Sequence, residues 1–195
     1  MEHYYSEKQS SPLSLKKVRQ EIKGKEFSFY VSSGIFSKER VDRGTLILAE
    51  SMIVSKNSDV LDIGCGIGVL GIAASRLFDA NAVMTDINER AVMLAKKNTQ
   101  LNNIKAEIFR GFLYEPIKKN DFDAILSNPP QTAGKKLCFE LIESSILHLK
   151  GNGTLQLVAR RNKGGKALRE KMREVFGNVK VVVKKSGYWV YLSVK

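Results

Sequence analysis

Hydrophobic and polar residues follow one another in blocks that predict strands and helices in regular succession. Short apolar runs rich in β-branched residues predict buried strands at 59–63, 82–85, 106–110, 123–127 and 153–159. Between them, apolar residues recur three and four positions apart and predict helices at 69–78, 88–101, 133–149 and 165–176. Strands that alternate with helices form a mainly parallel sheet covered on both faces, so the pattern predicts an α/β fold.

The N-terminal part predicts a β-hairpin followed by a capped helix. After a polar tail, alternating stretches at 18–22 and 27–31 flank Lys23-Gly24-Lys25, a sequence typical of a tight turn. Asp42 precedes the next apolar stretch, and aspartate is favoured at the N-cap position because its side chain accepts from a free backbone N–H group. We therefore expect a helix to begin directly after Asp42.

The C-terminal part predicts two strands, at 179–184 and 188–194, joined at Ser186-Gly187. A parallel connection needs a crossover of about a dozen residues, so these two strands must be antiparallel neighbours. We expect a seven-stranded, mainly parallel sheet with an antiparallel C-terminal strand. One domain at 34–195 would contain it, with the tail and hairpin at 1–33 as an appendage.

The composition predicts a globular protein that meets polyanions. Hydrophobic residues make up 43% of the 195 residues, which suffices for one core, and no apolar run resembles a signal peptide or a membrane span. Cys65 and Cys138 form neither a metal-ligand pattern nor a disulfide framework, so we expect reduced cysteines, no bound metal and a cytoplasmic location. The net charge of +12 attracts polyanions such as nucleic acids.

A glycine-rich turn follows a predicted strand and opens the next helix. Gly64, Gly66 and Gly68 permit a tight turn and let a ligand approach the backbone. The stretch fits the dinucleotide-binding fingerprint, because Gly71 completes the spacing after Gly66 and Gly68. However, the carboxylate of Asp62 would repel a pyrophosphate, whereas it suits the cationic amine and sulfonium of S-adenosylmethionine.

Asp86 ends the following predicted strand, 20 residues after Gly66. A carboxylate at this place in nucleotide-binding α/β folds accepts hydrogen bonds from the ribose hydroxyls. Either cofactor would use it, so an NAD-dependent oxidoreductase is an alternative at this point. Asp62 and the antiparallel C-terminal strands argue against that alternative.

The most informative stretch is Asn128-Pro129-Pro130, which follows the predicted strand at 123–127. Two prolines stiffen the turn and leave its carbonyl groups free to accept hydrogen bonds. The Asn128 side-chain oxygen and the Pro129 carbonyl can converge on the two hydrogens of an exocyclic NH2 group. Because this would turn the nitrogen lone pair toward a methyl donor, the motif predicts methyl transfer driven by positioning.

Together these motifs resemble class I S-adenosylmethionine-dependent methyltransferases that act on amino groups. More narrowly, the chain resembles archaeal single-domain relatives of the bacterial small-subunit ribosomal RNA guanine-N2 methyltransferases. Further motifs that carry this resemblance are Ser33-Gly34-Ile35-Phe36-Ser37, Val41-Asp42-Arg43-Gly44-Thr45, Asp86-Ile87-Asn88, Phe176-Gly177-Asn178-Val179 and Gly187-Tyr188. The resemblance implies a Rossmann-like fold, S-adenosylmethionine as cofactor and methylation of guanine N2 in ribosomal RNA.

The resemblance also implies site residues. The catalytic residues would be Asn128, Pro129 and Pro130, and the cofactor-binding residues Asp62, Gly64, Cys65, Gly66, Gly68, Asp86, Ile87, Gly111, Phe112 and Asn128. Gln131 stands where many amino-methyltransferases have an aromatic residue that stacks on the target base, which leaves Phe36 and Tyr188 as candidates for stacking. Phe112 stands where an acid often receives the adenine amino group, so we expect backbone groups and packing to hold adenine.

Basic residues after the fifth strand of the domain predict how RNA would be held. They lie at the carboxyl ends of the strands, where ligands bind in such sheets, and could position RNA through its phosphates. The expected substrate-binding residues are Phe36, Gln131, Arg160, Arg161 and Lys163. Lys184-Lys185 has the character of ordinary surface charge.

Two other functions fit the same motifs. A protein glutamine N5-methyltransferase would also act on an amide NH2 group, and Gln131 in place of an aromatic residue weakens the case for base stacking. A non-catalytic cofactor-binding module would not need the intact Asn128-Pro129-Pro130 motif. We expect RNA as partner, no membrane contact, and a monomer or a homodimer.

Overall fold

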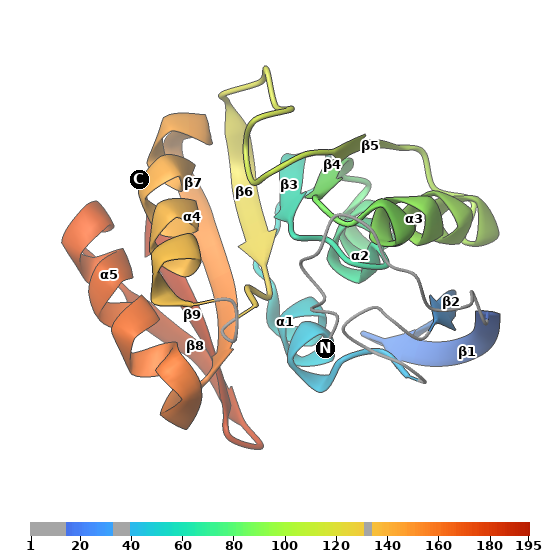
Figure 1. The fold of residues 1–195 in the computed structure, drawn as a ribbon, viewed down its shortest axis with the longest axis horizontal. Coiled ribbons are helices and arrows are strands. Elements are labelled where there is room, and N and C mark those ends of the chain that lie inside the picture. Colours follow the sequence, from blue (N-terminus) through green and yellow to red (C-terminus); the bar gives the residue numbers. More distant parts are fainter. Residues whose placement is uncertain (1–14, 33–39, 131–133) are drawn as a thin grey trace.

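The computed structural model describes residues 15–32, 40–130 and 134–195 and confirms the predicted α/β architecture (Figure 1). The strands are β1 (Leu15–Ile22), β2 (Lys25–Ser32), β3 (Asp59–Ile63), β4 (Asn81–Asp86), β5 (Ala106–Arg110), β6 (Phe122–Ser127), β7 (Leu149–Arg160), β8 (Lys180–Lys185) and β9 (Tyr188–Val194). The helices are α1 (Arg43–Ser51), α2 (Val69–Phe78), α3 (Glu89–Leu101), α4 (Lys135–His148) and α5 (Lys166–Phe176), with a π-helical turn, η2 (Arg161–Gly165), before α5.

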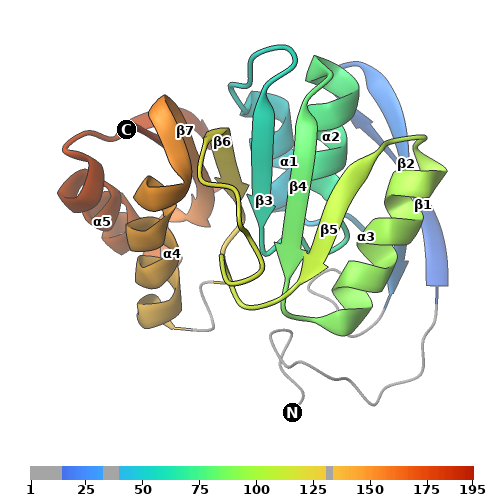
Figure 2. The same cartoon turned by 90° about the horizontal axis from the view of Figure 1, so that it is seen from above.

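Seven strands form one sheet in the order β5-β4-β3-β6-β7-β9-β8. The pairs from β5 to β7 are parallel, and β9 runs antiparallel to both β7 and β8. Helices cover both faces, with α4 and α5 packed together on one of them (Figures 1 and 2). The predicted seven-stranded sheet with an antiparallel C-terminal strand is therefore confirmed.

Alternating residues of the central strands separate two hydrophobic clusters. In β3, Val60 packs in the cluster that contains α1, α2 and α3, while Leu61 packs in the cluster that contains α4 and α5. In β6, Leu126 packs in the first of these clusters and Ile125 in the second. Because successive side chains of a strand point to opposite faces, a sheet buried on both sides needs continuous apolar runs of this kind.

The N-terminal hairpin packs into the core of the domain. Phe27 and Phe29 are buried in the same cluster as α2 and α3. Asn98 of α3 receives the Tyr30 backbone N–H at 2.7 Å and donates to the Tyr30 carbonyl at 3.2 Å. The hairpin predicted around Lys23-Gly24 is confirmed, and its strand β2 is held along α3.

The start of β7 differs from the sequence prediction. The strand begins at Leu149, directly after α4, whereas the pattern placed its first residue at 153. Leu149 is buried and pairs with Phe122, so the strand starts at the helix end. An irregularity in the β6 pairing between Phe122 and Ala124 accommodates the intervening residues. Gly153 belongs to this close approach, because a Cβ there would lie 2.9 Å from the Phe122 carbonyl oxygen.

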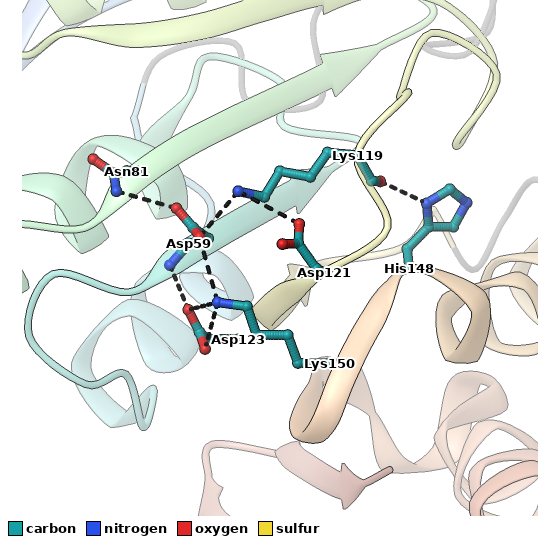
Figure 3. Close-up of polar contacts among 7 residues, drawn as sticks. All are labelled: Asp59, Asn81, Lys119, Asp121, Asp123, His148 and Lys150. Atoms are coloured by element: carbon teal, nitrogen blue, oxygen red, sulfur yellow. Dashed lines mark hydrogen bonds and ion pairs between the residues drawn. The ribbon is translucent and has the colours of Figure 1, made fainter.

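A cluster of charged residues lies where the parallel strands begin, at the amino edge of the sheet (Figure 3). This edge is opposite the one where the strands end in loops. Asp59 at the start of β3 forms ion pairs with Lys119 at 3.0 Å and Lys150 at 3.4 Å. Lys150 also pairs with Asp123 at 3.1 Å, and the Asp59 backbone N–H donates to Asp123 at 2.7 Å. Asn81 of β4 donates to Asp59 at 3.1 Å, so the cluster joins the first residues of neighbouring strands.

No helix in the described ranges combines the length and the apolar character that crossing a bilayer requires.

Candidate functional site

A cavity of about 420 Å³ opens at the carboxyl ends of β3, β4, β5 and β6. Seven of the predicted site residues line it: Gly64, Asp86, Ile87, Gly111, Phe112, Pro129 and Pro130. Other predicted residues are outside its lining: Asp62, Cys65, Gly66, Gly68 and Asn128. Its size is that of a small-molecule site, and it lies where ligands bind in parallel α/β sheets.

The glycines between the end of β3 and the first turn of α2 have two different roles, ligand access and packing. Gly64 has a φ of +66° and lines the cavity, and a Cβ added there would face open space. A ligand can therefore approach the backbone closely at this residue. Gly71 serves packing instead, because a Cβ there would lie 2.5 Å from Met84 Cε in β4. Gly68 likewise faces Met84 and Ala95, so its part in cofactor binding stays a prediction.

Asp86 at the end of β4 shapes the loop and borders the cavity. Its Oδ2 accepts the Gly66 N–H at 2.8 Å, and its Oδ1 accepts the Asn88 N–H at 2.9 Å. These bonds hold a buried carboxylate at the cavity wall with both oxygens oriented by backbone groups. Each carboxylate oxygen has a second lone pair, so the group could still accept from a ribose hydroxyl.

Asp62 in β3 carries an unsatisfied oxygen in the interior. Its Oδ2 accepts the Gly71 N–H at 3.0 Å, while its Oδ1 has no hydrogen-bond partner among the described residues. Burial raises the pKa of Asp62 to about 7; the Gly71 N–H opposes this shift and the nearby charge of Asp86 adds to it. A buried acceptor without a partner is costly, so this oxygen fits a cationic or hydrogen-bonding ligand group, directly or through water.

Asn128 is anchored to the first turn of α1. Its Nδ2 donates to Asp42 Oδ1 at 2.8 Å and to Thr45 Oγ1 at 2.9 Å. Asp42 is also the N-cap of α1, as predicted, and accepts the Thr45 N–H at 3.0 Å. The strand end before it is fixed too, because the Ser127 hydroxyl donates to the Ile63 carbonyl at 2.7 Å.

These contacts determine which way the Asn128 amide faces. An ionised carboxylate can only accept, so the group that faces Asp42 must be the amide nitrogen. Both amide hydrogens then have partners at the N-terminal end of α1, and the Asn128 oxygen points away from them. No contact within the described ranges occupies that oxygen, which leaves an oriented acceptor next to the prolines of the cavity wall.

One wall of the cavity was not predicted. Helix α4 contributes Lys136, Leu137, Cys138, Glu140 and Leu141. Cys138 is buried, and burial raises the pKa of its thiol to about 11, so the thiol stays neutral. The apolar spacing of α4 indicated a helix face, but only the fold shows that part of this face borders a cavity.

The predicted basic residues lie beside the last strand. Arg160 stacks over the Tyr188 ring at 5.0 Å, and its Nε donates to the Tyr188 hydroxyl at 2.9 Å. Arg161 stacks over the Trp189 ring at 4.9 Å, and Lys163 is exposed in the following turn. Phe36 and Gln131 lie outside the described residues, so their roles stay predictions.

Comparison with known proteins identifies the family to which this chain belongs. The family model described as the methyltransferase small domain matches residues 26–192. The chain is 38% identical to the uncharacterized protein YbxB of Bacillus subtilis (strain 168), over 100% of this chain and 98% of that protein. It is 32% identical to ribosomal RNA small subunit methyltransferase C of Haemophilus influenzae (strain PittGG), over 86% of this chain and 51% of that protein.

A solved structure gives the same family relationship. The T. thermophilus 16S rRNA N2 G1207 methyltransferase (RsmC), in complex with AdoMet and guanosine, superposes with a TM-score of 0.84 at 25% identity. The match covers 96% of this chain and 53% of that one. The chain thus spans about half the length of these small-subunit methyltransferases.

Proposed function

Since this chain belongs to the methyltransferase small domain family and its cofactor is S-adenosylmethionine, we propose that it methylates an exocyclic amino group of an RNA base. We propose guanine N2 as the target, because the two relatives described above with a named substrate are named for small-subunit ribosomal RNA, and one of them for N2 of a guanine. The oriented oxygen of Asn128 is the observation that carries the proposal.

Asp86 in the cavity lining and the buried Asp62 outside it fit the cofactor as hydrogen-bond acceptors. Asp86 would accept from the ribose hydroxyls, and the unsatisfied Oδ1 of Asp62 would meet the ammonium group, directly or through water. Gly64 leaves room for close approach of the backbone, and Ile87, Gly111 and Phe112 would pack around the adenine. When bound, S-adenosylmethionine supplies an electrophilic methyl group.

The chain's own residues would bind and orient the amine. The Asn128 oxygen and the Pro129 carbonyl would each accept one hydrogen of the NH2 group, which directs the nitrogen lone pair away from them. The amide cannot act as a base at neutral pH, so the surplus proton would leave to solvent. Catalysis would then come from positioning, which can contribute several kcal/mol when the reacting atoms are held close together.

The charge distribution supports RNA rather than protein as substrate. The net charge is +12, and Arg160, Arg161 and Lys163 lie at the carboxyl end of β7. Phosphate contacts from such residues would fix the register of a strand without reading its sequence. The target base must be unpaired or flipped out for its amine to reach Asn128, since base pairing occupies guanine N2.

The test is transfer of labelled methyl from S-adenosylmethionine to RNA that lacks the modification, followed by nucleoside analysis. N2-methylguanosine that appears with the wild-type chain and is lost with Asn128→Ala would support the proposal. Label in a glutamine side chain of a protein, or tight cofactor binding without transfer to any substrate, would overturn it.

A further inference from the structure

The tip of the β8–β9 hairpin lies against the helix turn that anchors Asn128. Arg43, the first residue of α1, donates from Nη2 to the hydroxyl of Ser186 in the tip. The Tyr188 ring crosses Gly44 so closely that a Cβ there would lie 2.9 Å from Tyr188 Cε1. The backbone of the turn after β7 joins them, because the Arg161 N–H donates to the Gly187 carbonyl at 3.0 Å. The hairpin tip and this turn are therefore held together beside the candidate site.

The next residue, Trp189, lies on the opposite face of the hairpin from Tyr188 and holds two cations there. The guanidinium of Arg161 is 4.9 Å from the indole centroid, and the ammonium of Lys184 is 4.6 Å from it. Lys185 follows Lys184 at the exposed tip, and its side chain leaves the other face of the hairpin, beside Tyr188. We call Arg161, Lys184, Lys185 and Trp189 the hairpin platform. An indole face attracts cations without neutralising them, so both positive charges remain available to an anion.

The chain segments that carry the hairpin platform contain no acidic residue. Residues 144–169 and 175–195 include neither aspartate nor glutamate. Elsewhere lysines pair with carboxylates, as Lys119 and Lys150 do at the amino edge and Lys171 does on α5. Within the described part of the chain, Arg161, Lys184 and Lys185 form no such ion pair. The sequence interpretation of Lys184-Lys185 as ordinary surface charge therefore misses this arrangement.

We propose that the hairpin platform binds the phosphates of a single RNA strand next to the target nucleotide. This inference rests on the proposed function, because it takes RNA as the substrate. Unpaired cations held beside the site suit a flexible strand whose backbone carries one charge per nucleotide. An unpaired strand is also what the site requires, because the target amine must be free of base pairing to reach Asn128.

The experiment uses Trp189 as its own probe, since it is the single tryptophan of the chain. Its fluorescence is followed while the full chain, without cofactor, is titrated with a single-stranded RNA of roughly 12 nucleotides, a length within the usual range of single-strand sites. The titration is repeated at several salt concentrations and with polyglutamate of the same charge. We expect a saturable change with RNA, and binding by polyglutamate that is at least tenfold weaker.

Charge-matched variants assign the phosphate contacts. Lys184→Gln and Lys185→Gln should each weaken RNA binding about fivefold and lower the slope of log affinity against log salt by about 0.7. Lys180→Gln is the control, because it removes the same charge from the other end of the same strand, roughly 13 Å from Lys184 and roughly 16 Å from Lys185. It should leave the slope unchanged.

Three outcomes would overturn the proposal. They are equal slopes for Lys184→Gln, Lys185→Gln and Lys180→Gln, polyglutamate binding as tight as RNA binding, and RNA binding without a change in Trp189 fluorescence. Methyl transfer by the wild-type chain to the same RNA is measured separately. If the RNA binds through the hairpin platform but receives no methyl group, the proposed function fails while the assignment of phosphate binding to the platform stands.

Discussion

Asn128 donates a hydrogen bond of 2.8 Å to Asp42, a residue 86 positions earlier in the chain. The same Asp42 oxygen accepts the Thr45 N–H, so the cap of α1 and the turn after β6 share one acceptor. Formation of the helix end therefore orients the amide that we propose holds the substrate amine. The Asp42 carboxylate thus both caps α1 and orients the Asn128 amide.

Asn128→Ala should reduce methyl transfer about 100-fold or more, because the amine would lose an oriented acceptor in the reacting geometry. The side chain is outside the lining of the proposed cofactor cavity, so cofactor affinity should stay within about twofold of wild type. Single-turnover transfer and calorimetric titration with S-adenosylhomocysteine measure the two effects. A large loss of cofactor affinity in this variant would contradict the assignment.

Asp86→Ala should show the reverse pattern. The carboxylate borders the cavity and orients the Gly66 N–H, so its removal should weaken cofactor binding at least tenfold. Transfer at saturating cofactor should fall much less than in Asn128→Ala. Titration and saturation kinetics separate the two quantities, and unchanged cofactor affinity would refute the proposed ribose role.

Thr45→Val and Thr45→Ser form a matched pair at the anchor of Asn128. Valine removes the oxygen that accepts from Asn128 Nδ2, whereas serine keeps it, and both keep the backbone N–H that Asp42 caps. We expect Thr45→Val to lower kcat about tenfold with little change in KM for RNA, and Thr45→Ser to retain most of the activity. Steady-state kinetics of both variants give the comparison.

The double variant Thr45→Val with Asn128→Ala controls for a purely structural effect. If the hydroxyl acts through the amide, Thr45→Val should cost little further activity once Asn128 is absent. A full additional tenfold loss would mean that Thr45 matters for another reason. Thermal unfolding of each variant checks that α1 remains intact.

The raised pKa of Asp62 predicts that the stability of the protein depends on pH. Burial raises its folded-state pKa to about 7 from the ordinary 3.8, so the folded protein binds a proton that the unfolded chain has already released. The stabilisation from Asp62 is therefore complete below about pH 4 and is lost as the pH rises through about 7. We expect the free energy of unfolding, measured in urea without cofactor, to fall less with rising pH in Asp62→Asn than in the wild type. Parallel curves of this free energy against pH for the variant and the wild type would contradict the prediction.

Asp59 predicts a dependence of the opposite sign. Burial would raise its pKa, but hydrogen bonds from Lys119 and Asn81 outweigh burial and hold the pKa below 3.8. Its contribution to stability is present above the ordinary pKa and is lost as the pH falls through the lower folded-state value. Asp59→Asn should destabilise the protein by about 1 kcal/mol at pH 7 and leave methyl transfer intact, because the cluster lies at the opposite sheet edge.

Asp79→Asn is the control for this measurement, because its ion pair with Lys56 is far more exposed. It should change the free energy of unfolding by no more than a few tenths of a kcal/mol. Equal effects of Asp59→Asn and Asp79→Asn would show that the cluster adds no more than ordinary surface charge.

Local signals predicted the elements of this fold well. The bounds of β3 and α2 agree with the apolar runs, and Asp42 and Asn88 are the N-caps that their residue types favour. These features depend on backbone preferences within a few residues, which a sequence displays directly. The start of β7 depends on the distant pairing of Leu149 with Phe122, and the pattern placed it too late.

Features that join distant residues could not be predicted in the same way. The cap of α1 was predicted, but the hydrogen bond from Asn128 to the same carboxylate depends on how α1 packs against the sheet. The sequence gives no reason to separate the roles of the glycines. The tertiary structure shows that Gly71 is required by packing against Met84, whereas Gly64 faces the cavity. The α4 wall and the cations on Trp189 likewise arise from tertiary contacts.

The strand order also bears on how the chain folds. In the described sheet, β8 pairs only with β9, and their turn at Ser186-Gly187 makes this the most local pairing of the sheet. Hairpins of this kind form in about 1–10 μs, whereas β3 and β6 must close a loop of 64 residues before they meet. Most of the surface that we assign to RNA is therefore built from short-range contacts, and the proposed cofactor cavity from long-range ones.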